Sequence, residues 1–284
     1  MNHKPTPDSP ARNRPAETRR DTLNFDAVIF DMDGVITRTA AVHSLAWKRM
    51  FDEYLRYREG MYDEHFREFA HAVDYLPYVD GRPRYKGVEA FLQSRGIGIP
   101  FGEPDDDPRQ ETVCGLGNRK NIFFNRVIKE EGVGVYESTI KLIWELLDQS
   151  IKVGVASSSK NCALILKQAL ITDLFETCVD GVVSARLGLR GKPEPDIFIR
   201  ASDNLGVKCH RAIVIEDAVS GVEAGAKGKF GLVIGIAREN NAAELAAHGA
   251  DVVVADLAEL TLERINQLIR QKQSLRQDGA GVAA

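Results

Sequence analysis

The sequence has few of the features that assign a chain to a class at first sight. No apolar run approaches the roughly 18 residues that a membrane-spanning helix requires. The formal net charge is only -4, which gives no electrostatic reason to bind nucleic acid or an anionic membrane surface. We therefore expect neither nucleic acid nor a membrane among the partners of this chain.

Cysteine is scarce as well. The four cysteines form no CxxC pair, which argues against a zinc site or a disulfide framework and favours reduced thiols; they are Cys114, Cys162, Cys178 and Cys209. Residues 1–23 are polar, contain several prolines and arginines, and lack the apolar core of a secretory signal. They predict a disordered leader and, by elimination, a cytoplasmic location.

What the chain does have is a regular alternation of strand and helix signals. A first apolar run covers residues 27–30, and from residue 135 onward short apolar runs alternate with helical spacing. Further strands are expected at residues 152–156, 178–183, 212–215, 232–236 and 251–254. This rhythm predicts an α/β fold with a parallel sheet covered by helices on both faces.

Residues 40–133 interrupt this pattern. Helices are expected at 39–58, 63–73, 87–95 and 116–130, and no convincing strand lies among them. We therefore predict an inserted all-helical cap domain at 40–133 and a core assembled from 24–39 and 134–272. A last helix is expected at 258–271, with a flexible tail at 273–284.

The first strand runs straight into two aspartates. Because side chains alternate along a strand, Asp31 and Asp33 are expected on the same side, and Gly34 lets the chain turn away. Two carboxylates so close repel each other unless a cation or a shared proton relieves them. An isolated pair of this kind is more often an Asp-rich turn than a site.

Three further stretches favour a site. Ligands of open parallel sheets bind at the carboxyl ends of the strands. A run of serines, Lys160 and Asn161 follows the second strand, Lys192 lies between prolines, and two acids follow the strand at 212–215; they are Ser157, Ser158, Ser159, Glu216 and Asp217. Each stretch alone also has an ordinary explanation as a helix start or a solvated loop. Together they indicate a hard-cation site beside a phosphate pocket.

Four segments carry a resemblance to a known family. FDAVIFDMDGVITRT, VASSSKN, GKPEPDIF and VIEDAVSGVEAG resemble, in this order, the four motifs of the haloacid dehalogenase superfamily. Within it, the chain most resembles the subfamily of β-phosphoglucomutase and its sugar-phosphate phosphatase relatives, over about residues 24–256. The resemblance implies a Rossmann-like three-layer α/β/α core with a helical cap, and Mg²⁺ as cofactor.

The resemblance also implies roles for single residues. Asp31 matches the nucleophile that forms an aspartyl phosphate, Asp33 the general acid/base, and Ser157 and Lys192 the groups that hold the phosphoryl. The matching metal ligands are Asp31, the backbone carbonyl of Asp33, Glu216 and Asp217. The matching phosphate- and substrate-binding residues are Thr39, His43, Trp47, Lys86, Ser158, Ser159, Lys160 and Asn161. Trp47 could equally well serve only to pack the cap.

One cap segment departs from the mutase pattern. After Lys86, Gly87 and Val88 the mutase has a serine and then an arginine that clamps the non-transferring phosphate. This chain has Glu89 and Ala90 there, although Arg82 and Arg84 lie just before. The aspartates at 105–107 have no functional explanation from sequence.

The predicted activity is phosphoryl transfer on a phosphorylated sugar, converting β-glucose 1-phosphate to glucose 6-phosphate. The alternative is a sugar-phosphate phosphatase, for example one acting on trehalose phosphate or a hexose phosphate. A non-catalytic binding module of this fold would be expected to have lost Asp31, Asp33, Lys192 or Asp217, and all four are present. We expect a monomer.

Overall fold

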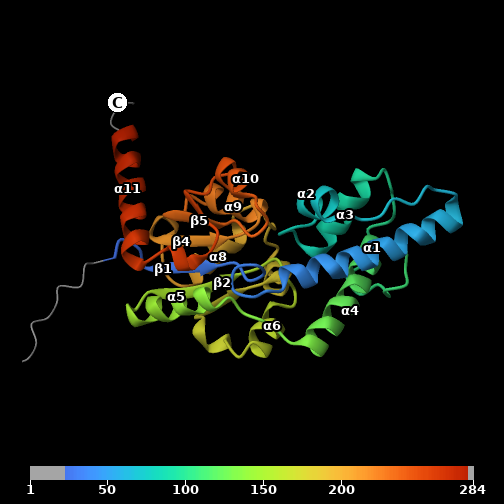
Figure 1. Ribbon diagram of the computed structural model, residues 1–284, viewed down its shortest axis with the longest axis horizontal. Helices are drawn as coiled ribbons and strands as arrows, with labels where there is room; N and C mark the ends of the chain where they lie inside the picture. Colours follow the sequence, from blue (N-terminus) through green and yellow to red (C-terminus); the bar gives the residue numbers. More distant parts are fainter. Residues whose placement is uncertain (1–22, 281–284) are drawn as a thin grey trace, which may run out of the picture.

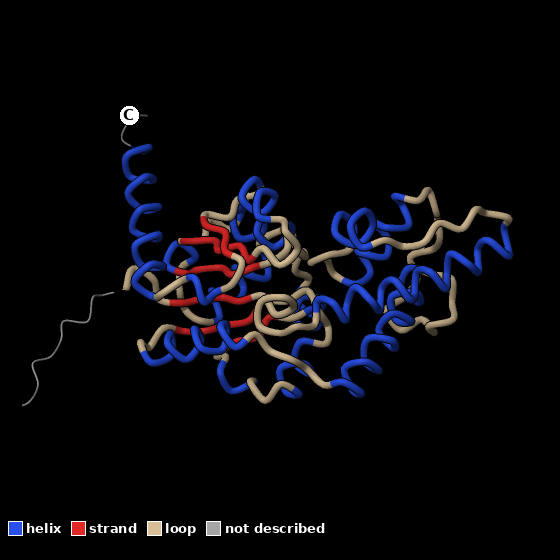
Figure 2. Tube along the Cα trace, in the orientation of Figure 1, coloured by secondary structure: helices blue, strands red, loops and turns tan. Residues whose placement is uncertain are grey.

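The centre of the molecule is a six-stranded sheet in which every neighbouring pair of strands is parallel. The structure, a computed structural model, describes residues 23–280, so almost all of the predicted leader lies outside the described residues. The order of the strands is β3-β2-β1-β4-β5-β6. Figure 1 labels β1, β2, β4 and β5, and Figure 2 draws the strands in red. Their bounds are β1 Ala27–Phe30, β2 Lys152–Ala156, β3 Thr177–Val179, β4 Ala212–Glu216, β5 Leu232–Ile236 and β6 Val252–Val254.

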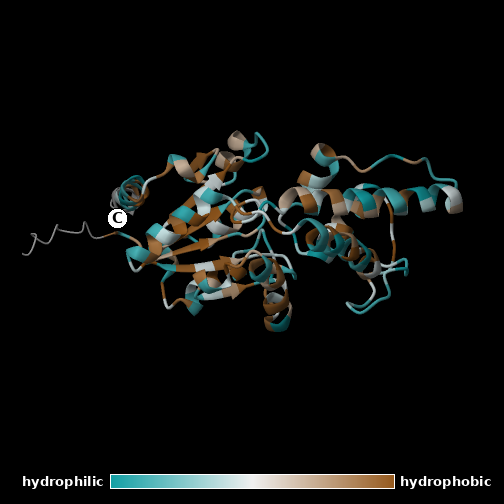
Figure 3. Ribbon diagram, turned by 60° about the horizontal axis from the view of Figure 1, so that its bottom comes forward, coloured by the Kyte–Doolittle hydropathy of each residue, from teal (hydrophilic) through white to brown (hydrophobic). Residues whose placement is uncertain are grey.

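Alternation along the strands explains the layers. In β1, Val28 and Phe30 face one hydrophobic cluster, while Ala27 and Ile29 face another. The first cluster is closed by α5 Glu137–Asp148, α6 Cys162–Gln168 and α11 Leu262–Ala280; the second by α7 Gly181–Leu187, α8 Asp196–Asn204, α9 Val219–Lys227 and α10 Ala242–Ala247. The apolar strands between more polar helices are evident in Figure 3. The predicted three-layer α/β/α fold is confirmed.

The segment 40–133, called the cap below, lies beyond the carboxyl ends of the strands (Figure 1). It contains helices and no strand: α1 Ala40–Tyr62, the π-helix η1 His71–Tyr75, α2 Leu76–Tyr78, α3 Arg84–Ser94 and α4 Val113–Glu131. A third hydrophobic cluster lies within it. At its centre the ring of Phe51 stacks on Trp47 and Phe69 and contacts Phe91, with centroids 4.1–5.4 Å apart.

Two short linkers join the cap to the core. Arg38 N donates to Gly134 O at 2.8 Å, and Tyr136 N donates to Ile36 O at 2.9 Å. These paired linkers bring α1 and α4, which are distant in sequence, side by side at the edge of the sheet where β1 ends (Figure 1).

Some predicted elements were wrong in extent. The strand expected at 178–183 ends at Val179, because the Asp180 carboxylate accepts from Val182 N and Val183 N and starts α7 instead. The helix expected at 63–73 does not form before His71: α1 ends at Tyr62, and the backbone of the next residue, Asp63, is left-handed with φ 55°. Residues 63–70 have no regular structure.

The end of the chain also differs from expectation. α11 continues past residue 271 to Ala280, so residues 273–280 of the predicted tail are helical and 281–284 lie outside the described residues. Lysine, glutamine, leucine and arginine in this stretch are good helix formers. Short 3-10 helices complete the fold: η2 Thr172–Leu174, η3 Cys209–Arg211 and η4 Leu257–Glu259. All four cysteines are free thiols. None of the helices within residues 23–280 combines the length and apolar character that crossing a bilayer requires.

The ring cluster of the cap leads to a stability prediction. Phe51 is fully buried, so Phe51→Ala should lower the free energy of unfolding by about 3–5 kcal/mol, because transfer and cavity costs add. Leu45→Ala on the same helix is the matched control: Leu45 is 64% exposed, and its loss should cost less than about 0.5 kcal/mol. Urea unfolding followed by circular dichroism measures both. Equal losses for the two variants would contradict the packing described.

Candidate active site

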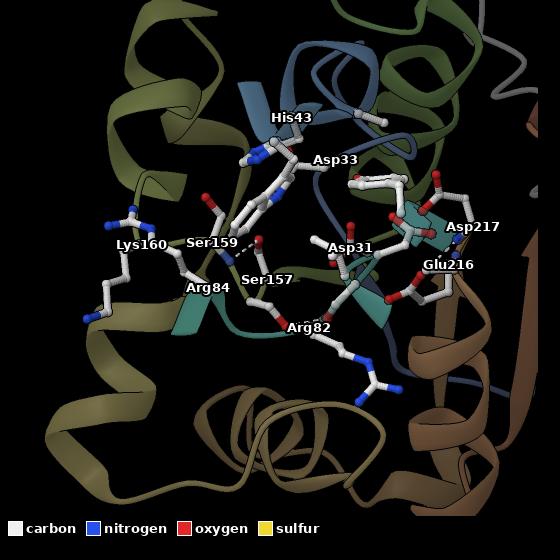
Figure 4. A pocket seen from close by; sticks show the side chains of 18 of the residues that line it. Asp31, Asp33, His43, Arg82, Arg84, Ser157, Ser159, Lys160, Glu216 and Asp217 are labelled. Atoms are coloured by element: carbon white, nitrogen blue, oxygen red, sulfur yellow. Dashed lines mark hydrogen bonds and ion pairs between the residues drawn. The ribbon is translucent and has the colours of Figure 1, made fainter. Parts of the chain in front are cut away.

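A cavity lies where the carboxyl ends of the central strands meet the cap. The core contributes Asp31, Asp33, Ser157, Lys160, Glu216 and Asp217; the cap contributes His43, Trp47, Tyr75, Asp80, Arg84 and Lys120. The segments that follow β1, β2 and β4 thus meet at one edge of the sheet, as parallel topology requires. Figure 4 shows the core carboxylates and the serine loop around this space.

The turn after β1 depends on glycine. Gly34 has φ +84°, a conformation that side chains disfavour, and a Cβ atom there would overlap the carboxylate of Asp217. The missing side chain therefore lets the loop after β1 and the loop after β4 approach closely. This close approach brings Asp217 beside Asp31, 186 residues earlier in the sequence.

Lys192 is the buried cation of the site. Its side chain is 1% exposed, and Nζ donates to Asp31 Oδ1 at 2.5 Å and to Glu216 Oε1. Burial alone would lower the pKa of Lys192, but the two carboxylates outweigh burial and raise it. Lys192 therefore stays protonated. Burial raises the pKa of Asp31 well above its usual value, and Lys192 opposes that shift.

One ammonium does not balance the carboxylates gathered here. Asp31, Glu216 and Asp217 offer oxygens that all lie within 4.8 Å of one another. Burial and the charges of Glu216, Asp80 and Asp31 raise the pKa of Asp217 well above its usual value. Three hard oxygen donors with excess negative charge fit a divalent cation.

Glu216 is held by its own loop. Its Oε2 accepts from Asp217 N at 2.8 Å and from Ala218 N at 2.9 Å, while Oε1 accepts from Lys192. A Cβ atom at Gly221 would overlap this carboxylate, so glycine is needed there. Glu216 therefore helps to fix the position of Lys192, whose ammonium it shares with Asp31.

Asp33 faces the cap. Thr39 Oγ1 donates to Asp33 Oδ1, and His43 Nε2 lies 3.4 Å from the same oxygen. Burial would raise the pKa of Asp33, but these two partners outweigh burial and lower it. Burial and the charge of Lys120 lower the pKa of His43. Lys120 Nζ lies 2.6 Å from His43 Nδ1, so a donation there leaves the ring proton on Nε2, facing Asp33.

The serine loop follows β2. Ser157 is buried, and its Oγ accepts from Ser159 N at 3.1 Å. Ser158 Oγ donates to the cap at Gly81 O, 2.8 Å away. Lys160 Nζ lies 4.6 Å from the centre of the Tyr85 ring. Ser157 to Lys160 all line the cavity, whereas the side chain of Asn161 donates to Asn121 of the cap at 2.7 Å.

Charge is separated across the cavity. Arg84 and Lys160 lie on one side and Glu216 and Asp217 on the other (Figure 4). Burial and the charge of Arg84 lower the pKa of Lys160. Arg82 also lines the cavity, but its guanidinium donates to Pro77 O, 3.4 Å away, on the exposed side of the site. Of the two arginines considered from sequence, Arg84 is the one whose side chain faces Lys160.

Of two cap residues expected to bind substrate, Lys86 lies away from the cavity and Trp47 lines it. Lys86 does not line the cavity: its side chain is 62% exposed and pairs with Glu89 at 2.8 Å, because α3 turns it toward solvent. Trp47 both lines the cavity and stacks on Phe51, so the packing and pocket interpretations hold together.

Sequence reasoning missed Lys120, Tyr75 and Asp80. For Lys120 a signal existed, because Leu116, Lys120, Phe124 and Ile128 follow one another at intervals of four and share a helix face. All four are buried, so the lysine occupies an apolar position. For Tyr75 and Asp80, which lie on η1 and the loop after α2, no periodicity gave a signal.

Comparison with known proteins places this geometry in a family. A family model described as haloacid dehalogenase-like hydrolase matches residues 25–229. The chain belongs to the haloacid dehalogenase-like hydrolases. The resemblance inferred from the four motifs is thus confirmed.

The chain matches relatives within this family over most of its own length and most of theirs. The chain is 46% identical over 237 residues to a β-phosphoglucomutase of Mycobacterium bovis, covering 82% of this chain and 90% of the relative. It is 32% identical over 245 residues to a β-phosphoglucomutase of Bacillus subtilis, covering 85% and 94%. A solved β-phosphoglucomutase from Clostridium difficile matches with TM-score 0.66 and 24% identity over 87% of this chain and 98% of the other, which supports the fold.

The buried cation gives a testable prediction. Lys192→Met keeps most of the volume but leaves Asp31 and Glu216 buried without their shared partner, so the free energy of unfolding should fall by about 3–5 kcal/mol. Lys227→Met is the matched control: Lys227 pairs with Glu194 at the surface, and its loss should cost less than about 1 kcal/mol. Urea unfolding in the presence of a chelator compares the two. A Lys192 variant as stable as the wild type would refute the role given to the buried pair.

Proposed function

We propose that this protein is a Mg²⁺-dependent β-phosphoglucomutase, which converts β-glucose 1-phosphate to glucose 6-phosphate through an aspartyl phosphate. The observation that carries the proposal is the pairing of Asp31 with Lys192 and Asp217 at the end of β1, in a chain 46% identical to a β-phosphoglucomutase over most of both lengths. A phosphatase is less well supported.

Asp31 is the nucleophile in this proposal. Its carboxylate oxygen attacks phosphorus, the bond to the sugar oxygen breaks, and the phosphoryl group is carried by Asp31 until a second sugar oxygen takes it. Lys192, already bonded to Asp31 Oδ1, offsets the repulsion between the carboxylate and the incoming phosphate. Ser157, buried beside them, supplies a hydroxyl donor to the transferring group.

Asp33 moves the proton between the sugar oxygen and the enzyme. Its lowered pKa means that it is charged when the phosphorylated enzyme awaits a sugar hydroxyl, so it can accept that proton. Thr39 and His43 hold its Oδ1 in place. Lys120, bonded to His43 Nδ1, fixes the ring so that its one N–H, at Nε2, faces Asp33.

A divalent cation, proposed to be Mg²⁺, would be held by Asp31, Glu216, Asp217 and the backbone carbonyl of Asp33. When bound, it supplies charge neutralisation for the transferring phosphoryl. The donor set is all oxygen, which suits Mg²⁺ over softer metals.

The separated charges suit a substrate with two anionic ends. The phosphoryl to be transferred would lie by Asp31, and the second phosphate would face Lys160 and Arg84. We propose that residues 40–133 act as a cap that closes over the core of 24–39 and 134–272, and that closure excludes water from the aspartyl phosphate. Exclusion of water favours transfer to a sugar hydroxyl over hydrolysis.

The product distribution tests the proposal. Purified protein is incubated with Mg²⁺, β-glucose 1-phosphate and a trace of glucose 1,6-bisphosphate. We expect glucose 6-phosphate to accumulate faster than free phosphate, and chelation by EDTA to stop the reaction until Mg²⁺ is restored. Free phosphate as the main product would instead assign a phosphatase, and neither product would exclude both activities on this sugar.

Asp31→Asn tests the covalent route. The amide cannot attack phosphorus, so turnover should fall at least a thousandfold, on the order of what removing a nucleophile costs. Asp26→Asn is the matched control: Asp26 lies at the other end of β1, paired at the surface with Arg211, and activity should be unaffected. Circular dichroism confirms folding of both. Substantial activity in Asp31→Asn would reject an aspartyl phosphate.

A further inference from the structure

One side-chain oxygen of the cap accepts two hydrogen bonds, one from a residue of the cap and one from a residue of the core. Asn121 Oδ1, on α4, accepts from Arg84 Nη2 of α3 at 2.8 Å and from Asn161 Nδ2 of the core at 2.7 Å. Arg84 lines the cavity, whereas Asn121 does not. Asn121 therefore lies behind the wall, in contact with one residue that faces the substrate space and one that precedes α6.

Hydrogen bonds and a contact with an aromatic ring also hold the residues around Asn121. Lys160 lies 4.6 Å from the Tyr85 ring, and Tyr85 Oη donates to Asn118 Oδ1 at 3.0 Å. Asn118 Nδ2 donates to the backbone oxygens of Pro104 and Asp106. The acidic loop that had no explanation from sequence thus anchors the helix that carries Asn118 and Asn121.

The cationic groups at this end repel one another. The charge of Arg84 lowers the pKa of Lys160 and of Lys120, although burial contributes more to both shifts. Arg84 would move away from its cationic neighbours unless something holds it. The neutral acceptor at Asn121 holds its guanidinium without cancelling its charge, so the charge remains available to an anion in the cavity.

We infer that Asn121 is a positioning residue that couples closure of the cap to assembly of the cationic end of the site. Arg84 and Asn121 belong to the cap, and Asn161 belongs to the core. The shared acceptor is therefore complete only when the cap lies against the core. In that state Arg84 faces Lys160, and the site is ready for the phosphate that is not transferred. This inference rests on the proposed function, since it names how that site recognises the far end of its substrate.

Asn121→Ala tests the inference in the full-length protein. We expect the KM for β-glucose 1-phosphate to rise about tenfold, because two hydrogen bonds that place Arg84 and Asn161 are lost. The kcat should change by less than about threefold, because Asn121 does not touch the reacting groups. Calorimetry with β-glucose 1-phosphate, Mg²⁺ and beryllium fluoride, which occupies Asp31, should show a matching loss of affinity.

A double-mutant cycle separates positioning from general destabilisation. If Asn121 acts in part through Arg84, the KM effects of Asn121→Ala and Arg84→Ala should combine to less than their product in the double variant. Asn125→Ala is the matched control: Asn125 lies one turn further along α4, and its Oδ1 has no hydrogen-bond partner among the described residues. Its KM and kcat should equal those of the wild type.

The outcomes are distinguishable. A wild type that converts the sugar phosphate, with an unchanged KM in Asn121→Ala or with fully additive effects in the cycle, overturns this inference alone. A wild type that neither binds nor converts β-glucose 1-phosphate overturns the proposed function and this inference with it.

Discussion

The rest of the site depends on a single buried ammonium shared by two carboxylates. Lys192 contacts Asp31 and Glu216, and Asp217 lies within reach of both acids. One positive charge cannot balance three negative ones in a buried place, so the arrangement is unfavourable until a further cation arrives. Burial, together with this excess of negative charge, raises the pKa of Asp217. The same excess of negative charge would repel a phosphate dianion, so an oxygen of Asp31 could reach phosphorus only once a further cation had lowered that repulsion.

The opposite end of the cavity has an excess of positive charge. Arg84, Lys160 and Lys120 gather there, and the pKa of each is lowered chiefly by burial. Each end of the cavity thus carries charge that its own residues do not balance. A ligand that places one phosphate at each end would relieve both charge excesses, which supports the substrate with two anionic ends proposed above. The bonds that hold these cations come from neutral groups, Asn121 for Arg84 and the Tyr85 ring for Lys160, so their charge stays available.

The sequence was informative where function follows directly from a strand end. Asp31, Ser157 and Asp217 could be predicted because a buried parallel strand places its following residue at a known edge of the sheet. The cap offered no such rule. Lys120 reaches the site only through the packing of α4 on α1, and Lys86 was assigned by its neighbours in sequence although α3 turns it outward. The length of β3 was missed because the capping carboxylate of Asp180 outweighed the β-branched residues that follow it.

Polar bonds join the cap to the core, beside the apolar packing of Ala46, Phe124 and Ile128 against the core. Ser158 donates to Gly81 O, Asn161 donates to Asn121, and His71 lies 3.3 Å from Glu239. Each such bond contributes about 0.5–1.5 kcal/mol, far less than a buried hydrophobic interface would. The first two of these bonds lie next to the serine loop and Lys160. In the function proposed above, a sugar phosphate at the cationic end would add its own interactions to these bonds and so favour the closed arrangement over Asp31.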